Sequence, residues 1–169
     1  LAGALALIPS AAAAQADAYD RYLDHGALTD ALRGLARTHS DLATVSSLAT
    51  TDGGRDIWLL TLASRQGRAA DERPALLIVA NIEANRLIGS STALYAAEHL
   101  LTRYAQDPAV KALLDERTIY VIPRANPDGA ELAFSLPGYE IPYKPYRGDA
   151  GNGGLNVRER GRDLNGDGL

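Results

Sequence analysis

The sequence predicts one α/β domain, and three stretches carry this prediction. Residues 75–80 are six consecutive apolar residues, a run too short for a buried helix and typical of a strand covered on both faces. A polar loop follows, and a helical pattern then begins at Ser90 or Ser91, either of which can cap it. A second buried strand is expected at residues 118–122, after that helix. Strands that alternate with helices in this way are typical of α/β folds.

A helix and a hairpin are expected before the apolar strand. Thr29 is predicted to cap the helix, whose apolar residues recur at helical spacing on one face, as Leu28, Leu32, Leu35 and Ala36. Residues 42–49 and 56–63 are rich in strand-forming residues, and residues 51–54, Thr-Asp-Gly-Gly, form a turn signal between them. Both faces of the second run are largely apolar, so we expect the hairpin to be covered on both sides.

Two helices and a turn are expected in the rest of the domain. Residues 91–104 are predicted to be helical, with their apolar face formed by Leu94, Ala97, Leu101 and Tyr104. Asp107 and Pro108 open a short second helix, the first as its cap and the second in its first turn. Residues 126–129, Asn-Pro-Asp-Gly, are interpreted as a tight turn with a short helix at 130–134 after it.

The composition limits the kinds of function. The chain has 169 residues, of which 46% are hydrophobic and 22% charged, as expected for one globular domain. Its formal net charge is −4 and its sequence pI about 5.3, so no overall basic field favours a nucleic acid as partner. Cysteine is absent, which excludes disulfides and thiolate metal sites.

The two ends of the chain differ in character from its middle. Residues 1–16 form an apolar segment of small residues that ends in Ala-Gln-Ala, typical of a secretory signal with its cleavage site. The alternative is a buried amino-terminal helix, and a membrane span would need about 20 apolar residues. We therefore expect a signal-peptide remnant and export to the periplasm or the extracellular space. Residues 135–169 are rich in Pro, Gly and Asp and are expected to form an incomplete insertion, with both chain ends cut from something longer.

In this order, the elements resemble the amino-terminal half of the peptidase domain of the zinc carboxypeptidases. The resemblance covers about residues 27–132 and is strongest in residues 74–91 and in the strand and turn at 119–129, IYVIPRANPDG. It implies a mixed β-sheet flanked by helices, with about four strands in the order 1-2-4-3 and three to four helices. Residues 17–134 are then a partial carboxypeptidase-like domain. In that strand order, residues 76–79 lack a neighbour on one side and leave an apolar edge exposed.

The resemblance also identifies a candidate zinc site, and the sequence departs from the family there. In the family, the loop after this strand carries His-x-x-Glu, which supplies two of the three protein ligands of a catalytic zinc ion. Here Glu83 and Arg86 occupy these two positions. Arg86 remains protonated, so it cannot ligate zinc and would repel it. We expect the two charges to pair and zinc, the cofactor of the family, not to bind.

Other polar residues provide weaker candidates. The family's third zinc ligand is a later His, whereas the three histidines of this chain, His25, His39 and His99, have no ligand spacing and are expected to be solvated. Asn85, Arg86 and Arg124 are candidate substrate-binding residues. Asp163, Asn165 and Asp167 fit the opening half of a calcium loop, D-x-[DN]-x-[DN]-G, so calcium is a second possible ligand.

The resemblance implies a metallocarboxypeptidase, which hydrolyses the carboxyl-terminal peptide bond of a peptide or protein substrate. We predict that this chain is a truncated form that is inactive by itself, because in the family the missing carboxyl-terminal half carries the later His ligand and the general-base Glu. No residue of the chain is therefore predicted to be catalytic. Two alternatives remain: a non-catalytic module that binds peptide carboxyl ends through Arg86 or Arg124, and a gene remnant without function.

Overall fold

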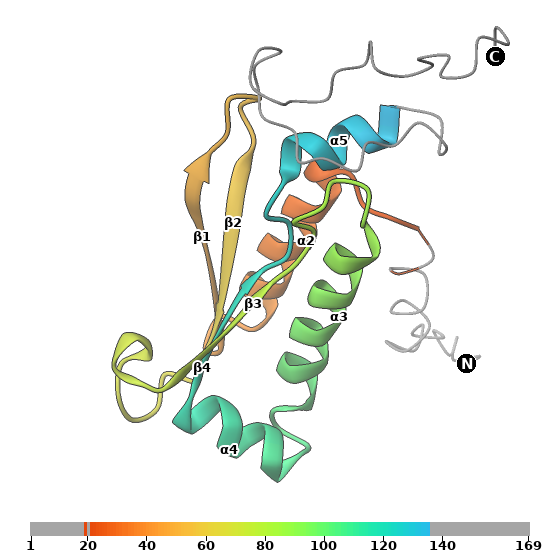
Figure 1. Cartoon of the computed structure of the whole chain (residues 1–169). Helices are drawn as coiled ribbons and strands as arrows, with labels where there is room; N and C mark the ends of the chain where they lie inside the picture. Colours follow the sequence, from red (N-terminus) through yellow and green to blue (C-terminus); the bar gives the residue numbers. More distant parts are fainter. Residues whose placement is uncertain (1–18, 20, 136–169) are drawn as a thin grey trace, which may run out of the picture.

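The computed structural model describes Tyr19 and residues 21–135 of the chain (Figure 1). The elements follow one another in this order: α2 (His25–Thr38), β1 (Ala43–Thr50), β2 (Asp56–Leu62), the short 3-10 helix η2 (Ala70–Glu72), β3 (Ala75–Val79), α3 (Ile88–Arg103), α4 (Pro108–Glu116), β4 (Thr118–Ile122) and α5 (Pro127–Ser135). Each predicted strand is present within about two residues of its expected position.

The four strands of the described chain form one mixed sheet in the order β1-β2-β4-β3. β2 pairs antiparallel with β1 and with β4, whereas β3 pairs parallel with β4. The mixed sheet and the strand order implied by the family resemblance are therefore confirmed. Because β3 and β4 run in the same direction, the loops that follow them emerge at the same end of the sheet.

α2 and α3 lie side by side along the sheet, with α4 near one end of it and α5 near the other (Figure 1). The core lies between these two helices and one face of the sheet. The residues of the helices and central strands that form it are Leu28, Leu32, Trp58, Leu60, Leu62, Ala93, Leu94, Ala97, Leu101, Ile119 and Val121. Alternate residues of β2 are buried, as expected for a strand with one covered face.

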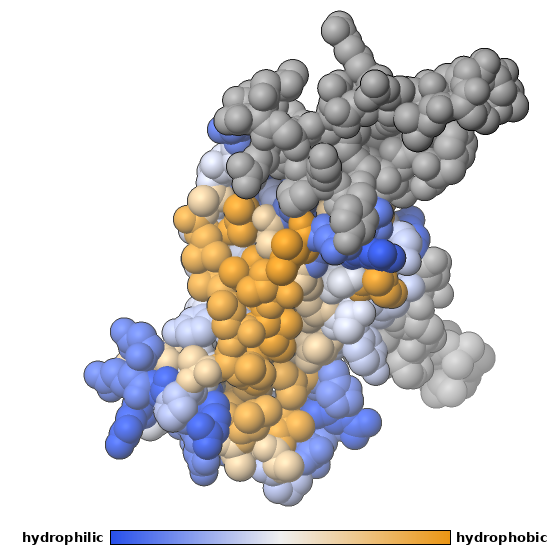
Figure 2. Space-filling model, in the orientation of Figure 1, coloured by the Kyte–Doolittle hydropathy of each residue, from blue (hydrophilic) through white to orange (hydrophobic). Residues whose placement is uncertain are grey.

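On the other face of the sheet the central strands β2 and β4 are only partly buried, and both edge strands are largely exposed. The expectation that the hairpin and residues 75–80 are covered on both faces is therefore wrong for the described structure, since β1 and β3 are exposed over most of their length. The expectation of an exposed apolar edge is confirmed: Leu76 and Leu77 are both 57% exposed, and Val79 is 40% exposed. Figure 2 shows this hydrophobic surface over the sheet. The physical reason is that the described helices pack on one face only.

Two helices begin earlier than the sequence predicts. α2 begins at His25 instead of after Thr29, and its cap is Asp24, whose carboxylate accepts a hydrogen bond from Ala27 N at 2.7 Å. α3 begins at Ile88 without a side-chain cap, so neither predicted serine caps it. Ser90 is instead buried inside the first turn of α3.

The start of α4 was predicted correctly from the sequence, and the start of α5 was not. Asp107 caps α4 as expected, because its carboxylate accepts a hydrogen bond from Ala109 N at 2.8 Å, and Pro108 follows in the first turn. Residues 126–129 are not a separate turn before a helix. Pro127 is the first residue of α5, and the Asn126 side chain accepts a hydrogen bond from Gly129 N at 3.0 Å as a cap does.

Within residues 21–135, none of the helices combines the length and the apolar character that a bilayer crossing requires.

Candidate functional site

The candidate site is the loop at residues 81–87, which connects the carboxyl end of β3 to α3. Backbone hydrogen bonds hold this loop against the segment that follows β4: Ala125 N donates to Ala80 O at 3.0 Å, and Asn126 N donates to Asn81 O at 3.2 Å. These bonds extend the parallel β3–β4 pairing beyond the strands. The loop therefore lies beside the start of α5, at the end of the sheet where α/β proteins place their ligand sites.

A buried asparagine sets the shape of the loop. Asn81 is 4% exposed and has a φ of 48°, in the left-handed region that asparagine tolerates better than most residues. Its side-chain amide donates to Glu83 O at 2.8 Å and so folds the loop back on itself. A side chain at Gly89 would lie 3.0 Å from Asn81 N, which leaves little space between the loop and the first turn of α3.

A second glycine allows α5 to approach the loop. A Cβ atom at Gly129 would lie 2.7 Å from Ala84 Cβ and 2.8 Å from Asn126 Oδ1. The Asn126 side chain also donates to Ile82 O at 3.4 Å. The start of α5 is therefore in direct contact with the candidate loop, and only a residue without a side chain fits at this contact.

Glu83 and Arg86 form an ion pair on the surface of this loop. Arg86 Nε lies 3.2 Å from Glu83 Oε2, and Arg86 N donates to Glu83 O at 3.0 Å, so the two residues close one tight turn. The Arg86 side chain is 65% exposed and the Glu83 side chain is 42% exposed. An exposed pair of this kind contributes about 0–1 kcal/mol to stability.

The described residues do not fit a catalytic zinc ion at this loop. A zinc hydrolase uses three neutral or anionic protein ligands and keeps one position open for water. Glu83 supplies one carboxylate, but its neighbour Arg86 is a fixed cation. Across residues 21–135, no group of three or more His, Asp or Glu side chains is close enough to hold a metal ion.

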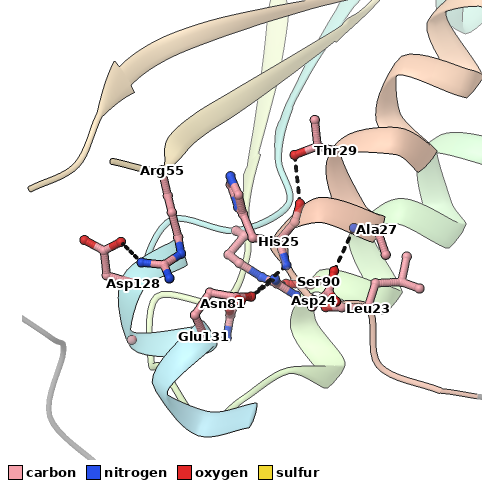
Figure 3. Close-up of polar contacts among 12 residues, drawn as sticks. Leu23, Asp24, His25, Ala27, Thr29, Arg55, Asn81, Ser90, Asp128 and Glu131 are labelled. Carbon is pink, nitrogen blue, oxygen red and sulfur yellow. Dashed lines mark hydrogen bonds and ion pairs between the residues drawn. The ribbon is translucent and has the colours of Figure 1, made fainter. Parts of the chain in front are cut away.

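Of the three histidines, His25 differs most from the expectation of a solvated side chain. Its backbone N–H donates to Glu131 Oε1 at 2.7 Å, and its Nδ1 is buried without a hydrogen-bond partner (Figure 3). Burial, with the nearby Arg124 guanidinium as a second cause, lowers the pKa of His25. The prediction is therefore wrong for His25, whereas His99 is exposed on α3.

Arg124 lies inside the protein, where its partners come from distant parts of the chain. It is 3% exposed, and its guanidinium donates to Ser90 Oγ at 3.2 Å and to Leu23 O at 2.7 Å. Its Nη1 lies 3.7 Å from Glu131 Oε1. Burial lowers the pKa of Arg124, and Glu131 partly opposes this effect. Arg124 thus connects the end of β4 to α3 and to the segment before α2, while Asn85 and Arg86 remain in the loop itself.

A partly buried ion pair between Arg55 and Asp128 was not anticipated from the sequence. Asp128, at the start of α5, accepts from Arg55 Nη1 at 2.9 Å and from Gly53 N at 3.1 Å, as Figure 3 shows for the arginine. A Cβ atom at Gly53 would overlap the Asp128 carboxylate. The glycine-rich turn of the hairpin therefore leaves space for this carboxylate. In the sequence, the only signal of this contact is an Asp-Gly pair at each of its ends.

A sequence model of the family described as zinc carboxypeptidase matches residues 28–167. The chain belongs to this family. Human carboxypeptidase D is 33% identical over 113 residues, which are 67% of this chain and 8% of that protein. The zinc carboxypeptidase of Saccharothrix mutabilis subsp. capreolus is 35% identical over 94 residues, 55% of this chain and 21% of that protein. The chain therefore spans a small part of the length of these relatives.

Solved structures share the fold. Thrombin-activatable fibrinolysis inhibitor aligns with a TM-score of 0.70 at 16% identity, over 81% of this chain and 33% of that one. Carboxypeptidase A from Helicoverpa armigera aligns with a TM-score of 0.64 at 22% identity, over 79% of this chain and 32% of that one. These similarities agree with the mixed sheet and with the strand order described above.

Some expectations concern residues outside the described part of the chain. The signal-like segment at 1–16 and the calcium candidates Asp163, Asn165 and Asp167 lie there, as does all but the first residue of the expected insertion at 135–169. The family match continues to residue 167 and so includes most of that insertion.

Proposed function

We propose that this chain is a family member that does not bind a catalytic zinc ion at the loop 81–87 and does not hydrolyse carboxyl-terminal peptide bonds by itself. The observation that carries the proposal is the Glu83–Arg86 ion pair, at 3.2 Å, in the positions that match the family's first two zinc ligands. The peptide substrates of the family are then potential ligands of this chain, but not substrates that it cleaves.

The ion pair opposes zinc binding in two ways. Glu83 would have to leave Arg86 before its carboxylate could ligate the ion. A Zn²⁺ ion about 4 Å from the guanidinium would also experience a repulsion of about 2 kcal/mol, even at the dielectric constant of water. This repulsion is larger in a partly buried loop, where the effective dielectric constant is lower.

Calorimetric titration of zinc into the full chain tests this proposal, with the double variant Glu83→His, Arg86→Glu measured in parallel. The unsubstituted chain is expected to show no saturable one-to-one binding. The double variant is expected to bind zinc more tightly, because two ligands replace a cation and its paired carboxylate. Arg103→Gln, on the exposed end of α3, is the control for the change in net charge, because it removes one positive charge and so matches the net change of the double variant.

Two results would contradict the proposal. One is tight one-to-one zinc binding by the unsubstituted chain. The other is zinc-dependent release of carboxyl-terminal residues from a peptide by that chain, in an assay where a metal chelator abolishes the release.

A second candidate function is binding of a peptide carboxyl end by Arg86. Its guanidinium is largely exposed, and the described structure engages only its Nε, so the outer N–H groups can form a bidentate contact with a carboxylate. Asn85 precedes it in the same loop. Arg124 could contribute only if its internal hydrogen bonds broke, since it is buried. Equal affinity for peptides with free and with amidated carboxyl ends would refute this function.

We further propose that the chain is exported, on the basis of residues 1–16, and that residues 17–134 and 135–169 are respectively the partial domain and an insertion. Fusion of residues 1–20 to a reporter enzyme that is active only outside the cytoplasm tests export. A reporter that stays inactive would contradict it.

A further inference from the structure

A groove of about 730 Å³ follows the outer edge of the sheet at β1. Its lining includes five consecutive residues of this strand, 43–47, together with Arg33, Ala36 and Arg37 of α2. Successive residues of a strand point to opposite faces of a sheet. A groove lined by five of them in a row must therefore run along the edge of the strand, between that edge and α2.

This edge has free backbone hydrogen-bonding groups. β1 is the first strand of the sheet order, and its neighbour is β2 on one side only (Figure 1). On its other side, Ala43 N donates to His39 O at 2.9 Å, whereas alternate N–H and C=O groups of residues 44–47 have no strand partner within the described chain. Natural edge strands are commonly protected by lysine, proline or a bulge. β1 contains neither residue, and its register shift lies between Ser47 and Ala49, at the end of the part that lines the groove.

The groove is also positively charged. Three of its lining residues, Arg33, Arg37 and Arg65, are exposed arginines, and none of its lining residues is acidic. Among the described residues, these arginines take part in no ion pair, although Asp56 lies near enough to Arg33 for a weak electrostatic effect. A concentration of unpaired positive charge contrasts with the net charge of −4 of the whole chain.

Trp58 forms part of the same wall and holds one of the arginines in place. The Arg33 guanidinium lies 5.1 Å from the centre of the Trp58 ring, within the range of a cation–π contact. Trp58 Nε1 donates to Thr29 Oγ1 at 2.9 Å, which fixes the ring between β2 and α2. The groove therefore presents an ordered cation beside an apolar surface.

We propose that this groove binds an extended acidic peptide as an additional strand of the sheet. The peptide backbone pairs with residues 44–47 of β1, and its carboxylates contact Arg33, Arg37 and Arg65. Strand addition supplies affinity through main-chain hydrogen bonds, and the alternate side chains supply specificity. A nucleic acid is a weaker match, because it offers no strand to pair with β1 and the net charge of the chain repels it.

The fluorescence of Trp58 reports binding directly, because it is the only tryptophan of the chain and it lines the groove. The probe is an acetylated and amidated octapeptide of alternating Glu and Val, titrated into the full chain. A saturable change in fluorescence that weakens with added salt is expected. Two control peptides separate the contributions: one has Lys in place of Glu, and the other keeps Glu but is N-methylated at every residue, which removes the N–H donors from both edges of the strand. Neither is expected to bind.

A matched pair of variants tests the role of charge. Arg37 and Arg103 are both exposed arginines in the last turn of a helix, but only Arg37 lines the groove. Arg37→Glu is expected to weaken binding about three- to tenfold, and Arg103→Glu to change it by less than about twofold. The proposal is overturned if the Glu-Val peptide does not bind or if both variants bind it equally. It is also overturned if the N-methylated peptide, or a polyphosphate without a peptide backbone, binds as tightly as the Glu-Val peptide.

Discussion

The contact between α5 and the candidate loop can be tested at Gly129. In Gly129→Ala, the new Cβ atom would lie 2.7 Å from Ala84 Cβ, whereas two carbon atoms prefer a separation of about 3.5–4.0 Å. Overpacking of this kind costs about 1–3 kcal/mol. An alanine in place of a helical glycine gains about 0.5–1 kcal/mol. We therefore expect a net loss of stability of about 1 kcal/mol.

Urea unfolding of the full chain, followed by circular dichroism, measures this loss as a shift in midpoint. Gly34→Ala is the matched control, since it is also a helical glycine but its Cβ would meet only Arg37 Nη2, at 4.0 Å. This control is expected to gain about 0.5–1 kcal/mol. The difference between the two variants then isolates the overpacking cost, and Ala84→Gly should recover part of it. If Gly129→Ala is as stable as Gly34→Ala, the described contact does not exist.

Two further predictions concern acid stability and self-association. The pKa of His25 is lowered from 6.5 in the folded protein, so the unfolded chain binds more protons between the two pKa values. The free energy of unfolding should therefore rise with pH up to about 6.5 and then level off, and His25→Gln should reduce this rise. Urea unfolding between about pH 5 and 7.5 measures the free energy of unfolding of both proteins. If the variant shows the same dependence on pH, the assignment to His25 is refuted. Leu77 is 57% exposed on β3, so Leu77→Lys should reduce self-association in sedimentation experiments and change stability by no more than about 0.5 kcal/mol. A large loss of stability would show instead that this face is buried.

The strands could be predicted because their signal is local. β2 and β4 are short runs of apolar and β-branched residues, and their bounds differ from the prediction by one residue at most. The start of α2 was missed because its cap, Asp24, precedes the apolar repeat that identified the helix. The start of α3 has no side-chain cap at all, so no residue type could have signalled it.

At the candidate site, too, a contact between neighbours in the sequence could be predicted and contacts between distant residues could not. The pairing of Glu83 and Arg86 could be anticipated because the residues are three positions apart in one loop. The burial of Arg124 could not, because its partner Leu23 lies 101 positions away and Ser90 lies 34 positions away. The contact of Arg55 with Asp128 spans 73 positions, so only the folded sheet brings the hairpin turn to α5.

The position of β4 between β2 and β3 determines the order in which the sheet can assemble. β1 and β2 are close in sequence, so their hairpin can form as soon as both have left the ribosome. β3 is also synthesised before β4, but β4 is its partner in the described sheet. Until residues 118–122 emerge, the apolar strand Ala75–Val79 therefore has no strand to pair with on either side. During synthesis, this segment therefore requires protection from aggregation, for example by a chaperone.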